Sequence, residues 1–326
     1  GAAAHQGLIK LVPMRITVCL TDNNRPEPWV EGLRAELPQA EVEAWTPGAA
    51  LADHAVVWAP PQAFLDEQQR LRGLFNIGAG VDALLKLKLP PHTRIVRLDD
   101  AGMSVQMAEY VCHALIRHFR EFDAYEADAR AGVWSYRRPR ARRDFPVGIM
   151  GLGVLGQRVG KAIAQFEFPV LGWSRSPKQI DGIRCFDGAP GLDAFLAASR
   201  VLVCLLPLTA ETHGILRAGT LGRLNGGRPG GYLINVARGA HLVEDDLIPL
   251  LDAGQLAGAT LDVFASEPLA PAHPFWRHPK ITVTPHTSAR TQREESVAQI
   301  AAKIRALEAG ADFYTLAGVV DGQRGY

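Results

Sequence analysis

The stretch VGIMGLGVLG, residues 147–156, runs from a short apolar segment through closely spaced glycines into a helical pattern. Between a strand and a helix, Gly151, Gly153 and Gly156 are typical of a turn that binds a dinucleotide. The first glycine permits the tight turn, the second lets the backbone approach a pyrophosphate, and the third lets helix and strand pack closely. The stretch therefore predicts a dinucleotide-binding domain; a glycine-rich turn without a ligand is the alternative.

Short apolar runs alternate with longer helical stretches on both sides of this turn, which is typical of βαβ units around a parallel sheet. We expect strands over residues 15–20, 55–58, 74–77, 94–98, 146–150, 169–173, 201–206, 232–236, 259–263 and 281–284. We expect helices over residues 29–37, 104–122, 153–166 and 293–309.

The length of the chain, 326 residues, suits two domains. The helical pattern over 104–122 contains neither Gly nor Pro and could bridge them. We expect an α/β protein of two parallel-sheet domains, Rossmann-like or flavodoxin-like, separated by a cleft. Because the terminal helix could return to the first domain, we expect a discontinuous substrate-binding domain over 14–102 and 290–326. The dinucleotide-binding Rossmann domain is expected over 103–289.

Charge and cysteine content narrow the class of function. The chain has 35 Lys and Arg against 34 Asp and Glu, a net charge of +1, so no excess of positive charge favours nucleic acid. No apolar stretch approaches the ~20 residues that a membrane helix needs. The cysteines are scattered without zinc spacing, so we expect no metal site and reduced thiols in a cytoplasmic protein. Residues 1–13 look like an added leader before Met14 and are excluded from the fold prediction.

The end of the strand predicted over 169–173 indicates which dinucleotide binds. NAD-binding folds usually place Asp or Glu there, where the carboxylate binds the ribose. Here the chain has Ser174, Arg175, Ser176 and Lys178 instead, and no carboxylate. A guanidinium can hold a 2′-phosphate through two hydrogen bonds, whereas a carboxylate would repel it. We expect NADP; NAD, with Arg175 and Lys178 as ordinary surface cations, is the alternative.

Other residues of the predicted cofactor site lie where strands end or the first helix begins, because ligands of doubly wound sheets bind at these edges. Thr212 could reach a phosphate, or it could cap a helix. The rest of this set is Val154, Leu155, Leu206, Pro207 and Val236.

Three polar side chains, Arg238, Glu267 and His286, follow three successive predicted strands. Strand ends converge on the cofactor crevice, so these side chains can meet there. Their chemistry fits reduction of a carbonyl: hydride adds to the carbon, and an imidazolium, which titrates near neutral pH, can protonate the oxygen. Glu267 would favour the imidazolium, and Arg238 can hold a substrate carboxylate through two hydrogen bonds. Taken singly, His286 and Glu267 could be structural; the ordered triplet favours catalysis.

Several segments together resemble those of the D-2-hydroxyacid dehydrogenase family, and more narrowly its glyoxylate/hydroxypyruvate reductase A branch. The resemblance extends from about Arg15 to Tyr326. Besides the glycine turn, it rests on LLPLTAETHG (205–214), NVARG (235–239), LDVFASEPL (261–269) and TPHTS (284–288). The chain departs from the branch at Pro177, where a basic residue is more common, which weakens the argument for NADP while leaving Arg175 and Lys178 in place.

The resemblance implies further substrate-binding residues. The backbone amides of Gly78, Ala79 and Gly80 are implied to bind the substrate carboxylate, and a glycine-rich turn does let amides approach an anion closely. A plain tight turn is the alternative. Trp45 and Trp134 resemble aromatic residues that close over a small substrate; packing under a loop is the alternative for both.

The resemblance also implies that Asp262 orients the nicotinamide carboxamide, that His286 lies against the cofactor, and that the chain forms a homodimer near the helix over 104–122. We therefore expect an NADPH-dependent reductase of small 2-keto acids, glyoxylate and hydroxypyruvate, with His286 as general acid. An NAD-dependent dehydrogenase of a bulkier D-2-hydroxy acid is one alternative. A dinucleotide-sensing binding module of the same fold is another. The expected partner is a small molecule rather than nucleic acid or a membrane.

Overall fold

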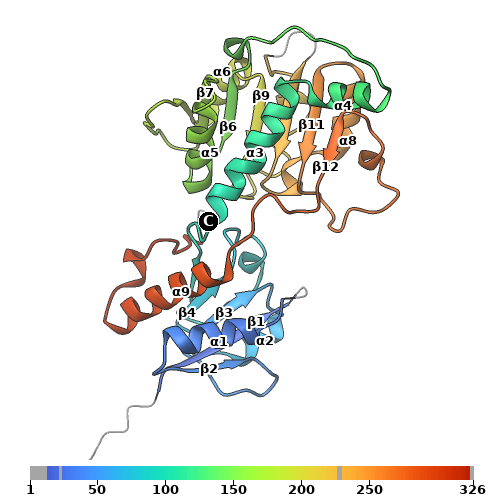
Figure 1. The fold of residues 1–326 in the computed structure, drawn as a ribbon. Helices are drawn as coiled ribbons and strands as arrows, with labels where there is room; N and C mark the ends of the chain where they lie inside the picture. The colour runs from blue at the N-terminus through green and yellow to red at the C-terminus, as the bar shows by residue number, and fades with distance from the viewer. Residues whose placement is uncertain (1–12, 22–23, 226–229, 324–326) are drawn as a thin grey trace, which may run out of the picture. The chain divides into compact units, whose positions relative to one another are not determined.

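The computed structural model describes residues 13–21, 24–225 and 230–323. The predicted leader lies outside the described residues except for residue 13. The chain forms two compact units: residues up to Ala101 together with those from Gln292 onward form the first unit, and Gly102–Thr291 form the second. Each unit holds one parallel sheet with helices around it (Figure 1), which confirms the predicted fold class of two parallel-sheet α/β domains.

The sheet of the first unit has five strands in the order β2-β1-β3-β4-β5, and every neighbouring pair is parallel. This is the order of flavodoxin-like sheets. The strands are β1 (Arg15–Leu20), β2 (Glu41–Ala44), β3 (His54–Trp58), β4 (Gly73–Asn76) and β5 (Arg94–Arg97). The helices are α1 (Glu27–Glu36), α2 (Gln62–Glu67) and α9 (Arg293–Glu308), with the 3-10 turns η1 (Leu84–Lys86) and η5 (Phe313–Thr315).

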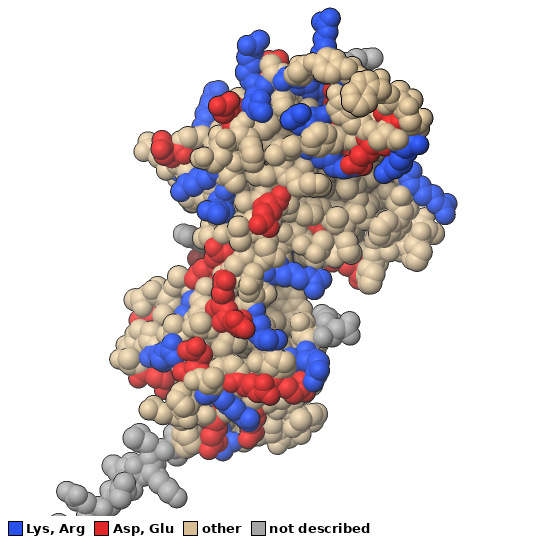
Figure 2. All heavy atoms as spheres, viewed as in Figure 1, with Lys and Arg blue, Asp and Glu red and all other residues tan. Residues whose placement is uncertain are grey.

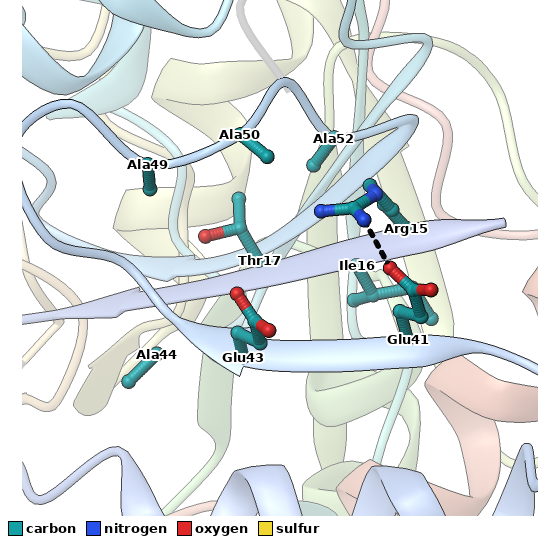
Figure 3. A pocket seen from close by; sticks show the side chains of 9 residues that line it. All are labelled: Arg15, Ile16, Thr17, Glu41, Glu43, Ala44, Ala49, Ala50 and Ala52. Carbon is teal, nitrogen blue, oxygen red and sulfur yellow. Dashed lines mark ion pairs between the residues drawn. The ribbon is translucent and has the colours of Figure 1, made fainter. Parts of the chain in front are cut away.

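The helix α9 comes from the far end of the chain and packs beside α1 (Figure 1). The two helices approach closely at Gly32, where a Cβ would lie 3.2 Å from the Val297 side chain. The sequence pattern does not predict β2, because only Val42 of this edge strand is buried. Arg15 pairs with Glu41 across β1 and β2, with Nη2 and Oε2 2.5 Å apart (Figure 3). The pocket around this pair has a volume of about 10 Å³, room for a single water.

The sheet of the second unit has seven strands in the order β12-β11-β10-β9-β6-β7-β8, again with every neighbouring pair parallel. Counted from β6, this is the Rossmann order 3-2-1-4-5-6 with one further strand at the edge. The order reverses between β6 and β9, so ligands are expected at the carboxyl ends of these two strands. The strands are β6 (Val147–Met150), β7 (Val170–Ser174), β8 (Arg184–Asp187), β9 (Val201–Cys204), β10 (Gly231–Asn235), β11 (Leu256–Leu261) and β12 (Ile281–Val283).

Helices cover both faces of this sheet, because its central strands are apolar on both sides. In β9, Val201 and Val203 pack with α3 and α5, whereas Leu202 and Cys204 pack with α6 and α8. The helices are α3 (Met103–Phe119), α4 (Phe122–Arg130), α5 (Val154–Ala164), α6 (Gly188–Ala198), α7 (Ala218–Leu221) and α8 (Glu244–Asp252). The 3-10 turns are η2 (Arg142–Asp144), η3 (Gly239–His241) and η4 (Pro274–Trp276).

The helix predicted over 104–122 is shorter than the sequence pattern indicates. α3 ends at Phe119, the chain turns at Glu121 with φ +56°, and α4 begins at Phe122. No Gly or Pro marks this break, so the sequence conceals it. α3 has 17 residues, and none of the helices in the described ranges combines the length and apolar character that crossing a bilayer requires.

The chain has nearly equal numbers of acidic and basic residues. Figure 2 shows acidic and basic side chains interspersed over the visible face.

His118, near the end of α3, is expected to make the second unit sensitive to acid. Its ring stacks on that of Tyr232, with centroids 4.0 Å apart. Burial, together with the charges of Arg140 and Arg200, lowers the pKa of His118 to about 3. The unfolded chain takes up a proton below a pKa of about 6.5, whereas the folded protein stays neutral there down to about 3. The free energy of unfolding therefore falls as the pH falls through this window.

We expect His118→Phe, which keeps an aromatic ring on Tyr232 and cannot titrate, to move the midpoint of acid unfolding to lower pH. Circular dichroism across a pH series measures this midpoint. His113→Phe, at an exposed position of the same helix, is the matched control and should leave the midpoint in place. A His118→Phe midpoint equal to that of the wild type would contradict the prediction.

Candidate active site

The glycine-rich turn follows β6 and opens α5, and each glycine has its own steric surroundings. A Cβ on Gly151, whose φ is +101°, would lie 2.6 Å from the carbonyl oxygen of Leu205. A Cβ on Gly156 would lie 1.9 Å from the carbonyl oxygen of Gly151. At Gly153 the space is open, with no atom of a distant described residue within 4 Å of the Cβ position. Two glycines thus serve the packing of the chain, and the third leaves room that fits a pyrophosphate at the start of α5.

The end of β7 carries hydroxyl groups and cations and no carboxylate. Ser174 is buried, and its hydroxyl donates a hydrogen bond to the carbonyl of Ser176, 2.9 Å away. This bond closes the turn that presents Arg175, Ser176 and Lys178, all of which are exposed. The turn therefore offers an anion two cationic side chains, which fits a 2′-phosphate better than a bare ribose.

The loop after β9 is held by its own side chains. The hydroxyl of Thr212 donates to the carbonyl of Pro207 at 2.7 Å and accepts from the amide of Thr209 at 2.8 Å. Leu206, at the start of the loop, is buried. In this arrangement Thr212 closes the loop, and its contact with a phosphate stays a prediction.

Arg238 lies in the turn that follows β10, directly after the buried Val236 and Ala237. The side chain of Asn235 shapes this turn, because it accepts from the amide of Ala237 and donates to the carbonyl of Arg238. Gly239 comes next, and a Cβ there would lie 1.8 Å from the carbonyl carbon of Phe264. The Arg238 turn is thus in backbone contact with the segment that leads to Glu267.

Glu267 and His286 form a hydrogen-bonded pair in which Nδ1 of His286 lies 2.7 Å from Oε2 of Glu267. The other carboxylate oxygen, Oε1, accepts from the amide of Phe264 at 3.0 Å. Burial raises the pKa of Glu267, but the hydrogen bonds from His286 and Phe264 and the charges of His286 and Arg238 outweigh it. The net pKa of Glu267 is lowered, so the carboxylate stays ionised. With Nδ1 engaged, Nε2 of His286 is the nitrogen available to a substrate.

Asp262, fully buried at the end of β11, holds the backbone around His286. Its carboxylate accepts from the amides of Thr287 and Ser288, each at 2.8 Å, and from the hydroxyl of Thr284 at 2.6 Å. Its carbonyl accepts from the amide of His286, a residue with the unusual φ of +49°. A non-glycine residue in this conformation needs surroundings that hold it there. The hydrogen bonds of Asp262 provide these surroundings. Its contact with the nicotinamide carboxamide stays a prediction.

A second contact fixes the same loop from α3. The hydroxyl of Tyr110 lies 2.5 Å from that of Thr284, and burial raises the pKa of Tyr110 to about 12. Sequence reasoning missed Tyr110 and Thr284. Thr284 stands two residues before His286, and this position was the available signal; nothing in the α3 pattern distinguishes Tyr110 from a core residue.

In the first unit, the turn of Gly78, Ala79 and Gly80 follows β4. The buried side chain of Asn76 organises it by donating to the carbonyls of Gly78 at 3.0 Å and Gly80 at 2.9 Å. A Cβ on Gly78 would lie 2.5 Å from the ring of Trp58, so this glycine has a packing reason of its own. The role of the three amides in binding a carboxylate stays a prediction, and Asn76 is a residue that sequence reasoning missed.

The two tryptophans proposed as lids differ in their surroundings. Trp45 packs edge-on against Phe64, with ring centroids 5.4 Å apart, and its buried indole nitrogen has no hydrogen-bond partner among the described residues. Packing within the first unit thus accounts for most of its environment. Trp134, in the second unit, is fully exposed. A substrate contact stays a prediction for both.

Within the second unit, Arg238, Glu267 and His286 place a guanidinium, a carboxylate and an imidazole near the carboxyl ends of the strands. The glycine turn lies at the same end of the sheet. This set can bind a carboxylate and donate a proton to an oxygen. Within the described residues, no group of three or more His, Cys, Asp or Glu side chains could hold a metal ion.

Residues 112–288 match the family model described as D-isomer specific 2-hydroxyacid dehydrogenase, NAD binding domain. The chain is 50% identical to glyoxylate/hydroxypyruvate reductase A of Serratia proteamaculans over 307 residues, 92% of this chain and 96% of that protein. It is 45% identical to the protein of the same name from Yersinia enterocolitica, over 91% of this chain and 96% of the relative.

Among solved structures, the NADPH-dependent glyoxylate/hydroxypyruvate reductase of Sinorhizobium meliloti, in complex with NADP and sulfate, is similar with a TM-score of 0.88 and 38% identity. The similarity covers 96% of this chain and 100% of that one. A D-isomer specific 2-hydroxyacid dehydrogenase of Xanthobacter autotrophicus, in complex with NADPH and MES, is similar with a TM-score of 0.89 and 36% identity, over 97% and 100% of the two chains.

Proposed function

The chain belongs to the D-isomer specific 2-hydroxyacid dehydrogenase family, and we propose that it reduces small 2-keto acids, glyoxylate and hydroxypyruvate, with NADPH. The observation that carries this proposal is the 2.7 Å contact between Glu267 and His286, near the charge of Arg238. The names of the reductase relatives support the substrate class. When bound, NADPH supplies the hydride.

The three side chains divide the remaining work. Arg238 holds the substrate carboxylate through two hydrogen bonds and polarises the carbonyl. His286 donates its Nε2 proton to the carbonyl oxygen as the new C–H bond forms. Glu267 fixes the orientation of the ring through Nδ1 and, as an ionised carboxylate, favours the imidazolium.

The cofactor is proposed to bind along the carboxyl edge of the sheet in the second unit. The open space at Gly153 and the first amides of α5 suit the pyrophosphate, and the turn after β7 suits the 2′-phosphate. The proposed cofactor residues are Gly151, Gly153, Val154, Leu155, Gly156, Ser174, Arg175, Ser176, Lys178, Leu206, Pro207, Val236, Asp262 and His286. Thr212, whose hydroxyl donates to the carbonyl of Pro207, is the remaining proposed member of this set.

The decisive experiment follows NADPH oxidation, by its absorbance, with 2-keto acids of increasing size: glyoxylate, hydroxypyruvate, pyruvate and phenylpyruvate. We expect kcat/KM to be highest for the two smallest polar acids. A kcat/KM that rises with side-chain size would instead favour a dehydrogenase of bulkier hydroxy acids.

Charge reversal at the turn after β7 tests the cofactor. We expect Arg175→Asp to lower kcat/KM for NADPH on the order of 100-fold and to change that for NADH little, because a charge-assisted bond becomes a repulsion. Lys161→Asp, an exposed reversal near the other end of α5, is the control and should leave the preference intact. If Arg175→Asp keeps the wild-type preference for NADPH, the 2′-phosphate assignment is wrong.

We also propose a homodimer and a cytoplasmic location. The segment after α4 exposes Val133, Trp134 and Tyr136, an apolar group of the kind that protein interfaces cover. Sedimentation velocity tests the dimer: a monomer at micromolar concentration would contradict it.

The cysteines support the proposed cytoplasmic location. All four are free thiols, as is usual in a reducing compartment.

A further inference from the structure

A buried histidine lies directly behind Arg238. His241 ends the 3-10 turn η3 and is 0% exposed. The amide of Arg238 donates to its Nδ1 at 3.2 Å, and its Nε2 lies 3.3 Å from the carbonyl oxygen of Pro207. Nδ1 is also 3.1 Å from the carbonyl oxygen of Arg238. Because the amide N–H of Arg238 points at Nδ1, we assign Nδ1 as the acceptor and Nε2 as the nitrogen that donates to Pro207.

The two nitrogens of this ring reach segments with different tasks. Pro207 belongs to the loop after β9, proposed to line the cofactor, and its carbonyl also accepts from the hydroxyl of Thr212. Arg238 belongs to the turn after β10, proposed to bind the substrate. Backbone bonds join the same two segments, from Gly214 to the carbonyl of Ala240 at 2.9 Å and from Leu216 to the carbonyl of His241 at 2.8 Å.

The position of the Arg238 backbone is therefore determined from two directions. Asn235 holds its carbonyl from the strand side, and His241 holds its amide from the interior. The next residue, Gly239, has no room for a side chain, because a Cβ there would lie 1.8 Å from the carbonyl carbon of Phe264.

We propose that His241 is a positioning residue that holds the cofactor loop after β9 with one ring nitrogen and the backbone of the substrate-binding Arg238 with the other. This inference rests on the proposed function, because it concerns the same site. His241 contacts neither substrate nor cofactor in it; the ring acts through the backbone of Pro207 on one side and of Arg238 on the other. A histidine that merely fills space would affect stability without distinguishing the two ligands.

Two substitutions separate the two bonds. In His241→Asn the side-chain oxygen takes the place of Nδ1 and can accept from Arg238, but nothing reaches Pro207. In His241→Gln the side-chain nitrogen can reach the place of Nε2 and donate to Pro207, but the Arg238 amide loses its acceptor. The readouts are the Kd of NADPH, from quenching of protein fluorescence, and the KM of glyoxylate at saturating NADPH.

We expect His241→Asn to raise the Kd of NADPH by about three- to tenfold and to leave the KM of glyoxylate within about twofold, as the loss of one neutral hydrogen bond implies. We expect His241→Gln to do the reverse, raising KM by about three- to tenfold with an NADPH Kd within about twofold. Ser199→Ala is the control. It removes a buried hydrogen bond elsewhere in the second unit, from the hydroxyl of Ser199 to a backbone carbonyl, and should lower only the melting temperature.

The proposal is overturned if both variants change Kd and KM in the same way, or if both change only the melting temperature as Ser199→Ala does. Its failure is distinguishable from failure of the proposed function. A wild-type protein that reduces no 2-keto acid refutes the function at once, whereas the NADPH affinity of His241→Asn still tests the cofactor half of the proposal.

Discussion

Replacing His286 with alanine is expected to lower kcat for glyoxylate reduction by about 10²- to 10⁴-fold, while the Kd of NADPH stays within about threefold. The imidazole, held by Glu267 at 2.7 Å, is the proposed proton donor, and its loss would leave the developing oxyanion without an acid. Cofactor binding is proposed to rest mainly on the glycine turn and the turn after β7, which the substitution does not touch. Steady-state kinetics and fluorescence titration with NADPH measure the two quantities separately.

A matched control exists in the same unit. His278 also faces a carboxylate, with Nε2 3.3 Å from Oδ1 of Asp252, but it lies before β12 rather than after it. We expect His278→Ala to keep kcat within about twofold, as is usual for substitutions away from a site. Equal losses of catalysis and NADPH affinity in His286→Ala would favour the other class of function, a dinucleotide-sensing module without turnover.

Strands that are apolar on both faces are the easiest part of the fold to predict from the sequence. β9 is an example, since Val201 to Cys204 alternate between two core clusters and give an unbroken apolar run. The edge strands β2 and β8 escape prediction because their outer faces are polar: β8 has no buried residue. The break at Glu121 escapes it because a non-glycine residue adopts a positive φ there.

For the site, the rule that strand ends converge predicts which segments meet, and it does so from spacing alone. It cannot show where a side chain points. The carboxylate of Asp262 accepts hydrogen bonds from Thr284, Thr287 and Ser288. The ring of His241 points inward to Pro207. The order of residues in the sequence does not show where either side chain points. Sequence-based prediction therefore finds candidate reacting groups more readily than the groups that hold them.

Arg238→Ala is expected to lower kcat/KM for glyoxylate by about 10²- to 10³-fold, because two charge-assisted hydrogen bonds to the substrate carboxylate are lost. Arg238→Lys keeps the charge but not the planar pair of donors, so its kcat/KM should fall between those of Arg238→Ala and the wild type. Added guanidinium ion should restore part of the activity of Arg238→Ala. Steady-state kinetics over a range of glyoxylate and guanidinium concentrations measures all three effects.

The fall in kcat/KM of Arg238→Ala should be largest with substrates that carry a carboxylate. Glyoxal, which offers an aldehyde in place of the acid, should react poorly with the wild type and lose less than glyoxylate in Arg238→Ala, because it cannot form the paired bonds and loses only the polarisation of its carbonyl. Arg277→Ala, an exposed arginine of the same unit, is the control for loss of positive charge and should leave both substrates unaffected. A fall for glyoxal as large as that for glyoxylate would show that Arg238 acts only on the carbonyl or on the fold, and does not bind the carboxylate.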